Sequence, residues 1–242
     1  MRDAILYSGT RNASSWAMRA WLALREAGVD FREEIVDIRR PQRFPNLARI
    51  ARFSPPGMVP VLDIAGDIIF DSLAIMEFAN DQAAGRLLPP DPIVRAQARS
   101  ILAWQHTGLS NICSRISFES AFYPYKRTLT SCEEAEAARL CNWLRQCIVK
   151  SGGPYLFGNL SLPDLALVPT ILKLVRHGID LGYAQEVQSW ASTLLNRESV
   201  IEWLREADSL PHIWYDDYLI PDIEPVLARS HALGAEAPLE IA

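Results

Sequence analysis

The stretch SPPGMVPVLDIAGDIIFDSLAIMEF, residues 54–78, decides the fold that we predict for this chain. Two apolar runs, 59–64 and 68–70, are separated by the tripeptide Ala-Gly-Asp, which is typical of a tight hairpin turn. A helix is expected directly afterwards, because Asp71 and Ser72 have side chains that favour a helix N-terminus and apolar residues then recur at helical spacing. The stretch therefore predicts two antiparallel strands followed by a helix.

The preceding residues predict a strand, a helix and a second strand. Residues 4–8 form an apolar run of the length of a buried strand, and residues 15–28 change to the spacing of a helix that ends at a glycine. Residues 30–38 alternate as a second strand, and a helical crossover of this length joins parallel strands. Residues 39–57 are interpreted as a loop with a short irregular helix. The order βαβ-α-ββα predicts an α+β, thioredoxin-like domain over residues 1–83.

A segment rich in glycine and proline, 84–92, is interpreted as a linker. Beyond it the pattern is almost wholly helical, and we expect an all-α helical-bundle domain over residues 93–242. The expected helices are 93–120, 132–150, 161–178, 184–196 and 198–208. Ser161 and Asp164 have the form of a capping box at the start of the third of these helices. The tail from residue 211 onward is rich in proline, and we expect it to be extended on the surface or frayed.

The composition argues against several classes of function. Lys and Arg number 24 against 29 Asp and Glu, so the net charge of -5 offers no overall positive field for nucleic acid or anionic lipid. No run approaches the roughly 20 apolar residues that span a bilayer, and the apolar run near the N-terminus is too short for a signal peptide. The four cysteines have neither CxxC spacing nor a nearby histidine cluster, which argues for reduced thiols and against zinc. We therefore expect a cytoplasmic protein without metal, nucleic acid partner or membrane association.

Three pieces of the sequence together are similar to one known family. The segments LYSGTRNASSWAMRAWLAL, SPPGMVPVLDIAGDIIFDSLAIMEF and PYLFGNLSLPDLAL have the order and separations of the cytosolic glutathione S-transferase family. The N-x-SSW opening resembles a bacterial subgroup related to the zeta class. The resemblance implies the fold of that family, a homodimer, and conjugation of glutathione, bound as its thiolate, to a small hydrophobic electrophile. Two alternatives stay open: a glutathione-dependent isomerase of the zeta (maleylacetoacetate isomerase) type, and a non-catalytic glutathione-binding or protein-interaction module.

The resemblance places the group that activates the glutathione thiol in RNASSWAMRAW, residues 11–21. A free cysteine thiol has a pKa of about 8.5, so a site must favour the anion through the helix dipole, free N–H groups and a donor aimed at sulfur. Asn12 lies at the position of the zeta-class catalytic serine, Ser14 is a rival donor, and Ser15 is a third candidate. These residue types also favour N-caps, so helix capping without chemistry is the alternative. Neither cysteine of a thioredoxin redox pair is present, which argues against thiol–disulfide exchange.

The resemblance also implies a set of residues that bind glutathione. Pro60 resembles the family's cis-proline turn, which would direct the backbone N–H and C=O of Val59 toward the ligand, and an ordinary trans proline is the alternative. Asp71 and Ser72 stand where the family has a pair at a helix N-terminus that binds the γ-glutamyl group. Arg40, in a local basic cluster, is expected to attract the glycyl carboxylate, unless the cluster is only a solvated face.

The helix expected over 93–120 would line the site of the second substrate. His106 and Tyr123 are assigned to this site, where aromatic and apolar side chains suit a hydrophobic electrophile, although such a stripe is also typical of core packing. For Arg19 we favour a structural role, such as a pair with an acidic residue, over binding of a ligand carboxylate. The sequence contains neither a phosphate-binding glycine loop nor a metal-ligand cluster, so glutathione is the one co-substrate that we expect.

Overall fold

The structure is a computed structural model, and it describes residues 3–179 and 185–212. The first part of the described chain follows the predicted order of strands and helices. The bounds of its elements are β1 Ala4–Gly9, α1 Ser15–Ala27, β2 Arg32–Val36, α2 Arg43–Ile50, β3 Val61–Ile64, β4 Asp67–Phe70 and α3 Ser72–Gln82. This is the predicted thioredoxin-like arrangement, and α2 is the short helix expected within 39–57.

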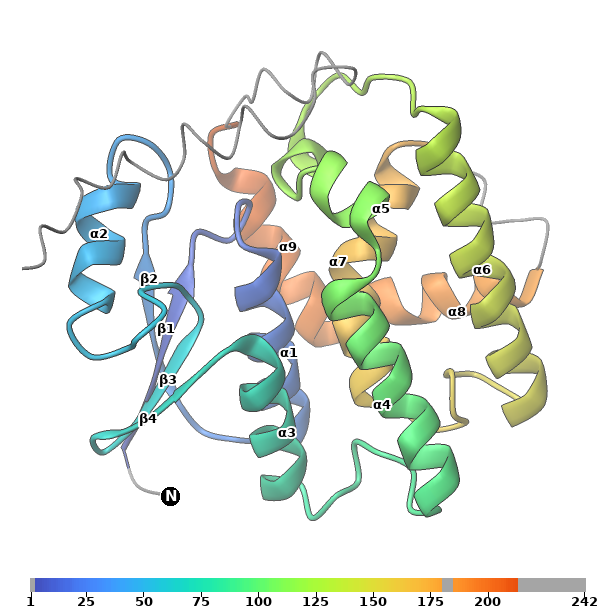
Figure 1. The fold of residues 1–242 in the computed structure, drawn as a ribbon, viewed down its shortest axis with the longest axis horizontal. Coiled ribbons are helices and arrows are strands. Elements are labelled where there is room, and N and C mark those ends of the chain that lie inside the picture. The colour runs from blue at the N-terminus through green and yellow to red at the C-terminus, as the bar shows by residue number, and fades with distance from the viewer. Residues whose placement is uncertain (1–2, 180–184, 213–242) are drawn as a thin grey trace, which may run out of the picture.

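The strands form one mixed sheet in the order β2-β1-β3-β4. β1 and β2 are parallel and are connected by α1, whereas β3 is antiparallel to both β1 and β4. Helices α1 and α3 lie on one side of the sheet and α2 lies on the other (Figure 1). Gly28 ends α1 with a φ of 74°, a left-handed conformation that glycine adopts without steric cost.

The second part of the described chain is helical, as predicted. Its elements are α4 Pro92–Thr107, α5 Ser110–Arg115, the short 3-10 helix η1 Glu119–Phe122, α6 Ser131–Ser151, α7 Leu162–Arg176, α8 Gln185–Leu195 and α9 Glu198–Ser209. Helix α7 is central, because it packs against α1, α4 and α8 and is buried from Leu162 to Leu174. One apolar core runs through both parts of the chain and includes Leu6, Ile75 and Trp190. Of the tail expected from residue 211 onward, only residues 211 and 212 lie within the described residues.

The single helix predicted over 93–120 is wrong in its length. Helix α4 ends at Thr107, and the separate helices α5 and η1 follow. A Cβ atom at Gly108 would lie 2.4 Å from Cδ1 of Trp104, so the indole occupies space that only glycine leaves open. The apolar spacing continues past this point, which is why the pattern did not predict the break.

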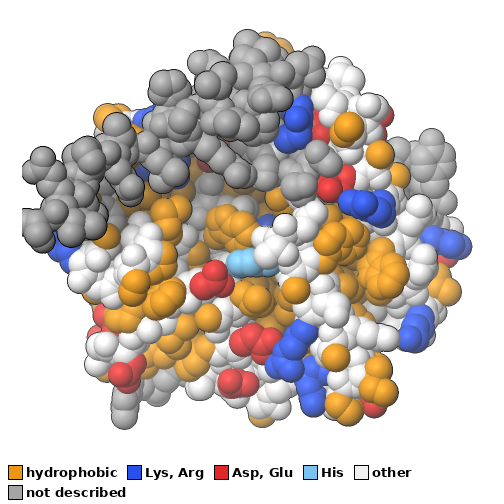
Figure 2. All heavy atoms as spheres, viewed as in Figure 1, with side chains coloured by type: hydrophobic (Ala, Val, Ile, Leu, Met, Phe, Trp, Pro, Cys, Tyr) orange, Lys and Arg blue, Asp and Glu red, His pale blue; other side chains and the backbone are white. Residues whose placement is uncertain are grey.

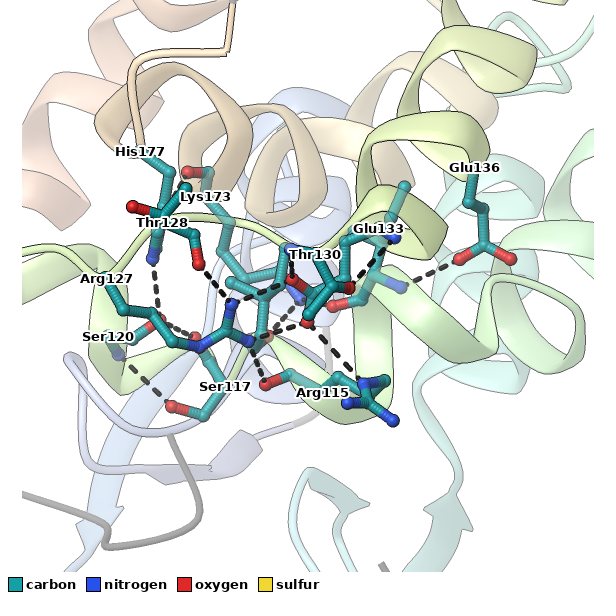
Figure 3. Close-up of polar contacts among 12 residues, drawn as sticks. Arg115, Ser117, Ser120, Arg127, Thr128, Thr130, Glu133, Glu136, Lys173 and His177 are labelled. Atoms are coloured by element: carbon teal, nitrogen blue, oxygen red, sulfur yellow. Dashed lines mark hydrogen bonds and ion pairs between the residues drawn. The ribbon is translucent and has the colours of Figure 1, made fainter. Parts of the chain in front are cut away.

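A buried polar cluster fixes the chain between α5 and α7 (Figure 3). Glu133, in the first turn of α6, accepts from Nη1 and Nη2 of Arg127 at 2.8 and 2.6 Å. Lys173 of α7 donates to the carbonyl oxygens of Ile112 and Ile116 at 3.0 and 2.8 Å, and burial lowers the pKa of its ammonium to about 8. Because a buried charge without partners is costly, these contacts favour one position of α5 against α7.

Candidate active site

Three chain segments meet at one edge of the sheet because of the strand register. Tyr7 of β1 pairs with Val61 of β3, and Val61 pairs with Phe70 of β4. The ends of β1 and β4 therefore lie beside the start of β3, so the turn 10–14, the turn 59–60 and the start of α3 come together. These segments, together with the first residue of α1, carry the predicted residues Asn12, Ser14, Ser15, Val59, Pro60, Asp71 and Ser72.

The Val59–Pro60 peptide bond is cis, as predicted. Val59 is buried in a small apolar cluster with Val36 of β2. A Cβ atom at Gly9 would lie 3.1 Å from Cγ2 of Val59, so the end of β1 runs directly against this turn. The glycine therefore allows the close approach of the two segments.

Asp71 caps α3, as its residue type predicts. Its Oδ1 accepts from the backbone N–H of Leu73 at 2.7 Å. The φ of Asp71 is 75°, a left-handed backbone conformation that residues with a Cβ rarely adopt. Ser72, the first residue of α3, is buried beside this cap. The N–H groups of the first helical turn and the positive end of the helix dipole can bind an anion here.

The two serines at the start of α1 make contacts that stabilise the helix. Ser14 is the N-cap residue, and its Oγ accepts from the backbone N–H of Ala17 at 3.2 Å. The Oγ of Ser15 accepts from Nη1 of Arg19 at 3.2 Å. Capping is thus confirmed for Ser14. Because both oxygens act as acceptors in these contacts, both hydroxyl hydrogens remain available for a ligand.

Asn12 has a partner that the sequence did not indicate. Its Nδ2 donates to the carbonyl oxygen of Pro211 at 3.0 Å, across 199 residues of sequence. The residue is 1% exposed, and its Oδ1 has no hydrogen-bond donor among the described residues. The second hydrogen of the amide group is left for another acceptor.

His106 of α4 reaches residues of the thioredoxin-like part. Its Nε2 lies 3.6 Å from Oδ2 of Asp71, and its ring centroid lies 5.0 Å from that of Trp16 in an edge-on arrangement. All three side chains are partly exposed, and we call them the rim cluster. His106, which is predicted to bind the second substrate, therefore lies beside residues at this edge of the sheet.

Arg19 is buried and has the structural role that the sequence favours. Its Nε donates to the carbonyl oxygen of Ala166 in α7 at 2.8 Å, and its guanidinium carbon lies 4.4 Å from the ring centroid of Trp16. With the Gln105 amide oriented so that its oxygen faces Arg19, that oxygen accepts from Nη2 at 2.7 Å. These partners are neutral oxygens and a ring, where an acidic residue was expected. Burial lowers the pKa of Arg19 to about 10, so the side chain stays charged at neutral pH.

Arg40 and Tyr123 occupy very different environments. Arg40 is exposed before α2, next to Arg39, which donates to both carboxylate oxygens of Asp37 at 2.9 Å. Tyr123 is buried directly after η1, and its carbonyl oxygen accepts from Nζ of Lys126. Its interior position is typical of core packing, the alternative for this stretch.

Among residues 3–179 and 185–212, no three or more His, Cys, Asp or Glu side chains come together in a way that could hold a metal ion. No helix within the same residues has the length and apolar character needed to cross a membrane. The four cysteines, which lie in described segments, are free.

Comparison with known sequences points to one family. Residues 13–82 match the family model described as glutathione S-transferase, N-terminal domain. The maleylacetoacetate isomerase of Mus musculus is 31% identical over 189 residues, which cover 74% of this chain and 81% of that protein. The maleylacetoacetate isomerase of Rhizobium meliloti (strain 1021) is 29% identical over 196 residues, which cover 74% of this chain and 85% of that protein.

Solved structures share the fold. A glutathione S-transferase from Rhodospirillum rubrum F11 superposes with a TM-score of 0.69 at 20% identity, covering 89% of this chain and 98% of that one. A glutathione transferase homologue from Burkholderia, solved with bound glutathione, superposes with a TM-score of 0.63 at 20% identity, covering 87% of this chain and all 100% of that one. The predicted combination of a thioredoxin-like part and a helical part is thus confirmed.

Proposed function

The chain belongs to the glutathione S-transferase family, and we propose that it binds glutathione as the thiolate and conjugates it to a small hydrophobic electrophile. The thiolate sulfur attacks an electrophilic carbon and forms a C–S bond, while a leaving group departs or a neighbouring carbon takes up a proton. One observation carries the proposal: the strand register brings the segments 10–14, 59–60 and 71–72 to one edge of the sheet.

Each of these segments supplies a group that suits one part of glutathione. The backbone of Val59 beside the cis proline can pair with the cysteinyl residue as an added strand would. The start of α3, with Ser72, can bind the γ-glutamyl carboxylate, and the carboxylate of Asp71 can accept from the ammonium. Arg40 is exposed and can attract the glycyl carboxylate from solvent. The glutathione transferase homologue from Burkholderia that was solved with bound glutathione shares this fold, which supports the assignment of a glutathione site.

The thiol-activating group is assigned to Asn12, with Ser14 and Ser15 as the other candidates. An amide hydrogen can donate to a thiolate but the amide cannot take up its proton, so Asn12 would act by stabilising sulfur. Ser14 and Ser15 accept hydrogen bonds from Ala17 and Arg19, but each keeps its hydroxyl hydrogen as a donor, so both stay as candidates beside Asn12. The positive end of the α1 dipole adds to the stabilisation of the anion.

The test is the titration of the bound thiol, followed by thiolate ultraviolet absorbance against pH. We expect Asn12→Ala to raise the apparent pKa of bound glutathione by about one unit, because one hydrogen bond to a charged group is lost. Asn196→Ala is the matched control, since it also removes an amide that donates to a backbone carbonyl, that of Ser192 at 2.8 Å, at an exposed position directly after α8. An unchanged titration in Asn12→Ala together with a shift in Ser14→Ala would transfer the role to Ser14.

An isomerase is the second candidate, because two of the relatives are named maleylacetoacetate isomerase. In an isomerase the thiolate adds to the substrate, the adduct rotates, and the thiolate leaves again, so glutathione is regenerated. Product analysis separates the two reactions, since conjugation consumes glutathione and isomerisation does not. A protein that is retained on immobilised glutathione but turns over neither aryl halides, enones nor maleylacetoacetate would be a binding module.

The second substrate is assigned to the rim cluster. Trp16 and His106 present two adjacent aromatic rings at the boundary of the two parts of the chain. Such a surface suits an electrophile with a flat apolar group. His106 also lies within reach of the Asp71 carboxylate, so it links the electrophile side to the glutathione side.

A homodimer and a cytoplasmic location complete the proposal. Two apolar surfaces lie on the face shown in Figure 2, one over β4 and α3 and one between α4 and α6. The second is a hollow of about 670 Å³ lined by residues that include Ile101, Trp104 and Trp143. We assign both surfaces to contact with a second copy of the chain. Free cysteines support a reducing compartment.

A further inference from the structure

The last described helix, α9, contacts the turn that carries Asn12. The indole Nε1 of Trp203 donates to the carbonyl oxygen of Arg11 at 3.0 Å, and Trp203 is 0% exposed. Figure 1 shows α9 beside α1, at the boundary between the two parts of the chain. A helix of the C-terminal part therefore bonds to the backbone of the turn, one residue before Asn12.

The side chain of Arg11 fixes the same turn. Its guanidinium carbon lies 4.8 Å from the ring centroid of Trp21 and 4.3 Å from that of Trp203. The guanidinium also forms ion pairs with Glu33 of β2 at 2.5 Å and with Glu206 of α9 at 2.8 Å. These contacts compensate for the desolvation of a buried charge. The Arg11 side chain is thus held in place by residues of three elements, β2, α1 and α9.

The chain just beyond α9 adds a third contact, from the carbonyl oxygen of Pro211 to Nδ2 of Asn12 at 3.0 Å. Within the turn itself, the N–H groups of Ala13 and Ser14 both donate to the carbonyl oxygen of Thr10 at 2.9 Å. These two hydrogen bonds close the turn at Thr10 but do not involve Arg11 or Asn12. The contacts from α9 and from residue 211 restrict the conformational freedom of the turn at these two residues.

We propose that Trp203 is a positioning residue for thiol activation, holding the turn 10–14 through the Arg11 carbonyl so that Asn12 and Ser14 face the bound sulfur in one geometry. This inference rests on the proposed function. Electrostatic stabilisation of an anion requires donors that are already oriented, and a displacement of about 1 Å can cost roughly 100-fold in rate. A loosened turn would stabilise the thiolate less, so the acid limb of the pH–rate profile would move to higher pH.

The first test compares two tryptophans. Trp203→Phe keeps an aromatic ring for packing and removes the Nε1 donor. Trp190→Phe is the matched control, because Trp190 is equally buried and its Nε1 donates at 2.8 Å to Asp164, between α7 and α8. We expect both variants to lose thermal stability. Only Trp203→Phe should raise the apparent pKa of bound glutathione and lower kcat/KM for an aryl halide, by roughly tenfold to 100-fold.

A second pair of variants decides the question if Trp203→Phe does not fold. Glu206 and Glu202 both lie on α9 and are partly exposed, and Glu202 pairs with Arg25 of α1 at 2.7 Å, away from the turn. Both Glu206→Ala and Glu202→Ala should therefore fold. We expect only Glu206→Ala to shift the thiol titration, in the same direction as Trp203→Phe and by a smaller amount.

The outcomes separate this inference from the proposed function. If Trp203→Phe and Glu206→Ala both give the same thiol titration as the wild type, the role of Trp203 is overturned and the proposed function is not. An equal shift in Trp190→Phe would also overturn it, because the effect would then come from general loosening of the fold. A wild-type protein that shows no thiolate absorbance with glutathione would overturn the proposed function and this inference together.

Discussion

His177, at the end of α7, is a histidine held in its neutral form. Its Nδ1 lies 2.7 Å from the carbonyl oxygen of Lys173 and its Nε2 lies 3.5 Å from Oγ of Ser120 (Figure 3). Burial, together with the nearby charges of Lys126, Arg127 and Lys173, lowers the pKa of His177 to about 4. Charging this imidazole therefore opposes folding.

We expect His177 to make the protein less stable as the pH falls from 6.5 to about 4. The unfolded chain takes up the proton near the ordinary pKa, whereas the folded chain does not, so the free energy of unfolding decreases through this window. The full shift corresponds to about 3 kcal/mol, and partial exposure of the ring reduces the expected effect to about 1–2 kcal/mol. Urea unfolding of wild type and His177→Gln at several pH values measures it, and two parallel stability curves would contradict the prediction.

Single residues show how far sequence reasoning extends to the site. Ser14 as a helix cap and Val59–Pro60 as a cis bond could be predicted, because local residue types determine both. The contact of Asn12 with Pro211 could not be predicted, because the partners are 199 residues apart and a backbone carbonyl has no sequence signature. For the same reason, the neutral partners of Arg19 were missed and an acidic partner was expected.

Helices α7 and α4 each have an aspartate at their N-terminal end, but the two carboxylates lie in different surroundings. Asp164, in the first turn of α7, is fully buried, and its carboxylate accepts from the N–H of Leu156, the N–H of Ser161 and the indole of Trp190. Asp91 caps α4 at the surface and accepts from the N–H groups of Ile93 and Val94. The first carboxylate satisfies buried donors from three segments, whereas water can replace the second.

We therefore expect Asp164→Ala to destabilise the protein much more than Asp91→Ala. Removal of Asp164 leaves several buried donors unpaired, at a cost of about 3–5 kcal/mol. Loss of the exposed cap costs about 1 kcal/mol. Denaturant unfolding of the two variants measures the difference, and equal losses would show that α7 does not depend on its buried carboxylate.

Elements could be predicted where the pattern is local. The capping box at Ser161 and Asp164 and the hairpin of β3 and β4 follow from adjacent residue types, and the structure contains both. The end of α4 at Gly108 depends instead on the position of the Trp104 indole, which the apolar spacing does not contain.

The candidate site combines parts of the chain that are far apart in sequence. The strand register brings three segments of the thioredoxin-like part together, and this arrangement follows from the predicted order of elements. Two further contacts join the helical part to these segments, that of His106 in α4 with Asp71 and that of Trp203 in α9 with the Arg11 carbonyl. Both depend on how the helical part packs against α1. Packing between distant helices is decided by the shapes of many side chains at once, so the sequence pattern indicated the helices but not these contacts.

The two apolar surfaces assigned to the homodimer interface each carry an exposed aromatic side chain. Phe70, at the end of β4, is 41% exposed, and Trp143 of α6, beside the hollow between α4 and α6, is 50% exposed. If these surfaces meet in a second copy, Phe70→Glu buries a charge at the interface and should weaken the dimer by at least about 3 kcal/mol, roughly 100-fold in Kd. Phe44→Glu is the matched control, because Phe44 is 55% exposed on α2, away from both surfaces. Sedimentation at micromolar concentration should give the mass of two chains for wild type and Phe44→Glu and of one chain for Phe70→Glu. A single-chain mass for the wild type would contradict the proposed dimer. A two-chain mass for Phe70→Glu would show that the dimer interface lies elsewhere on the molecule.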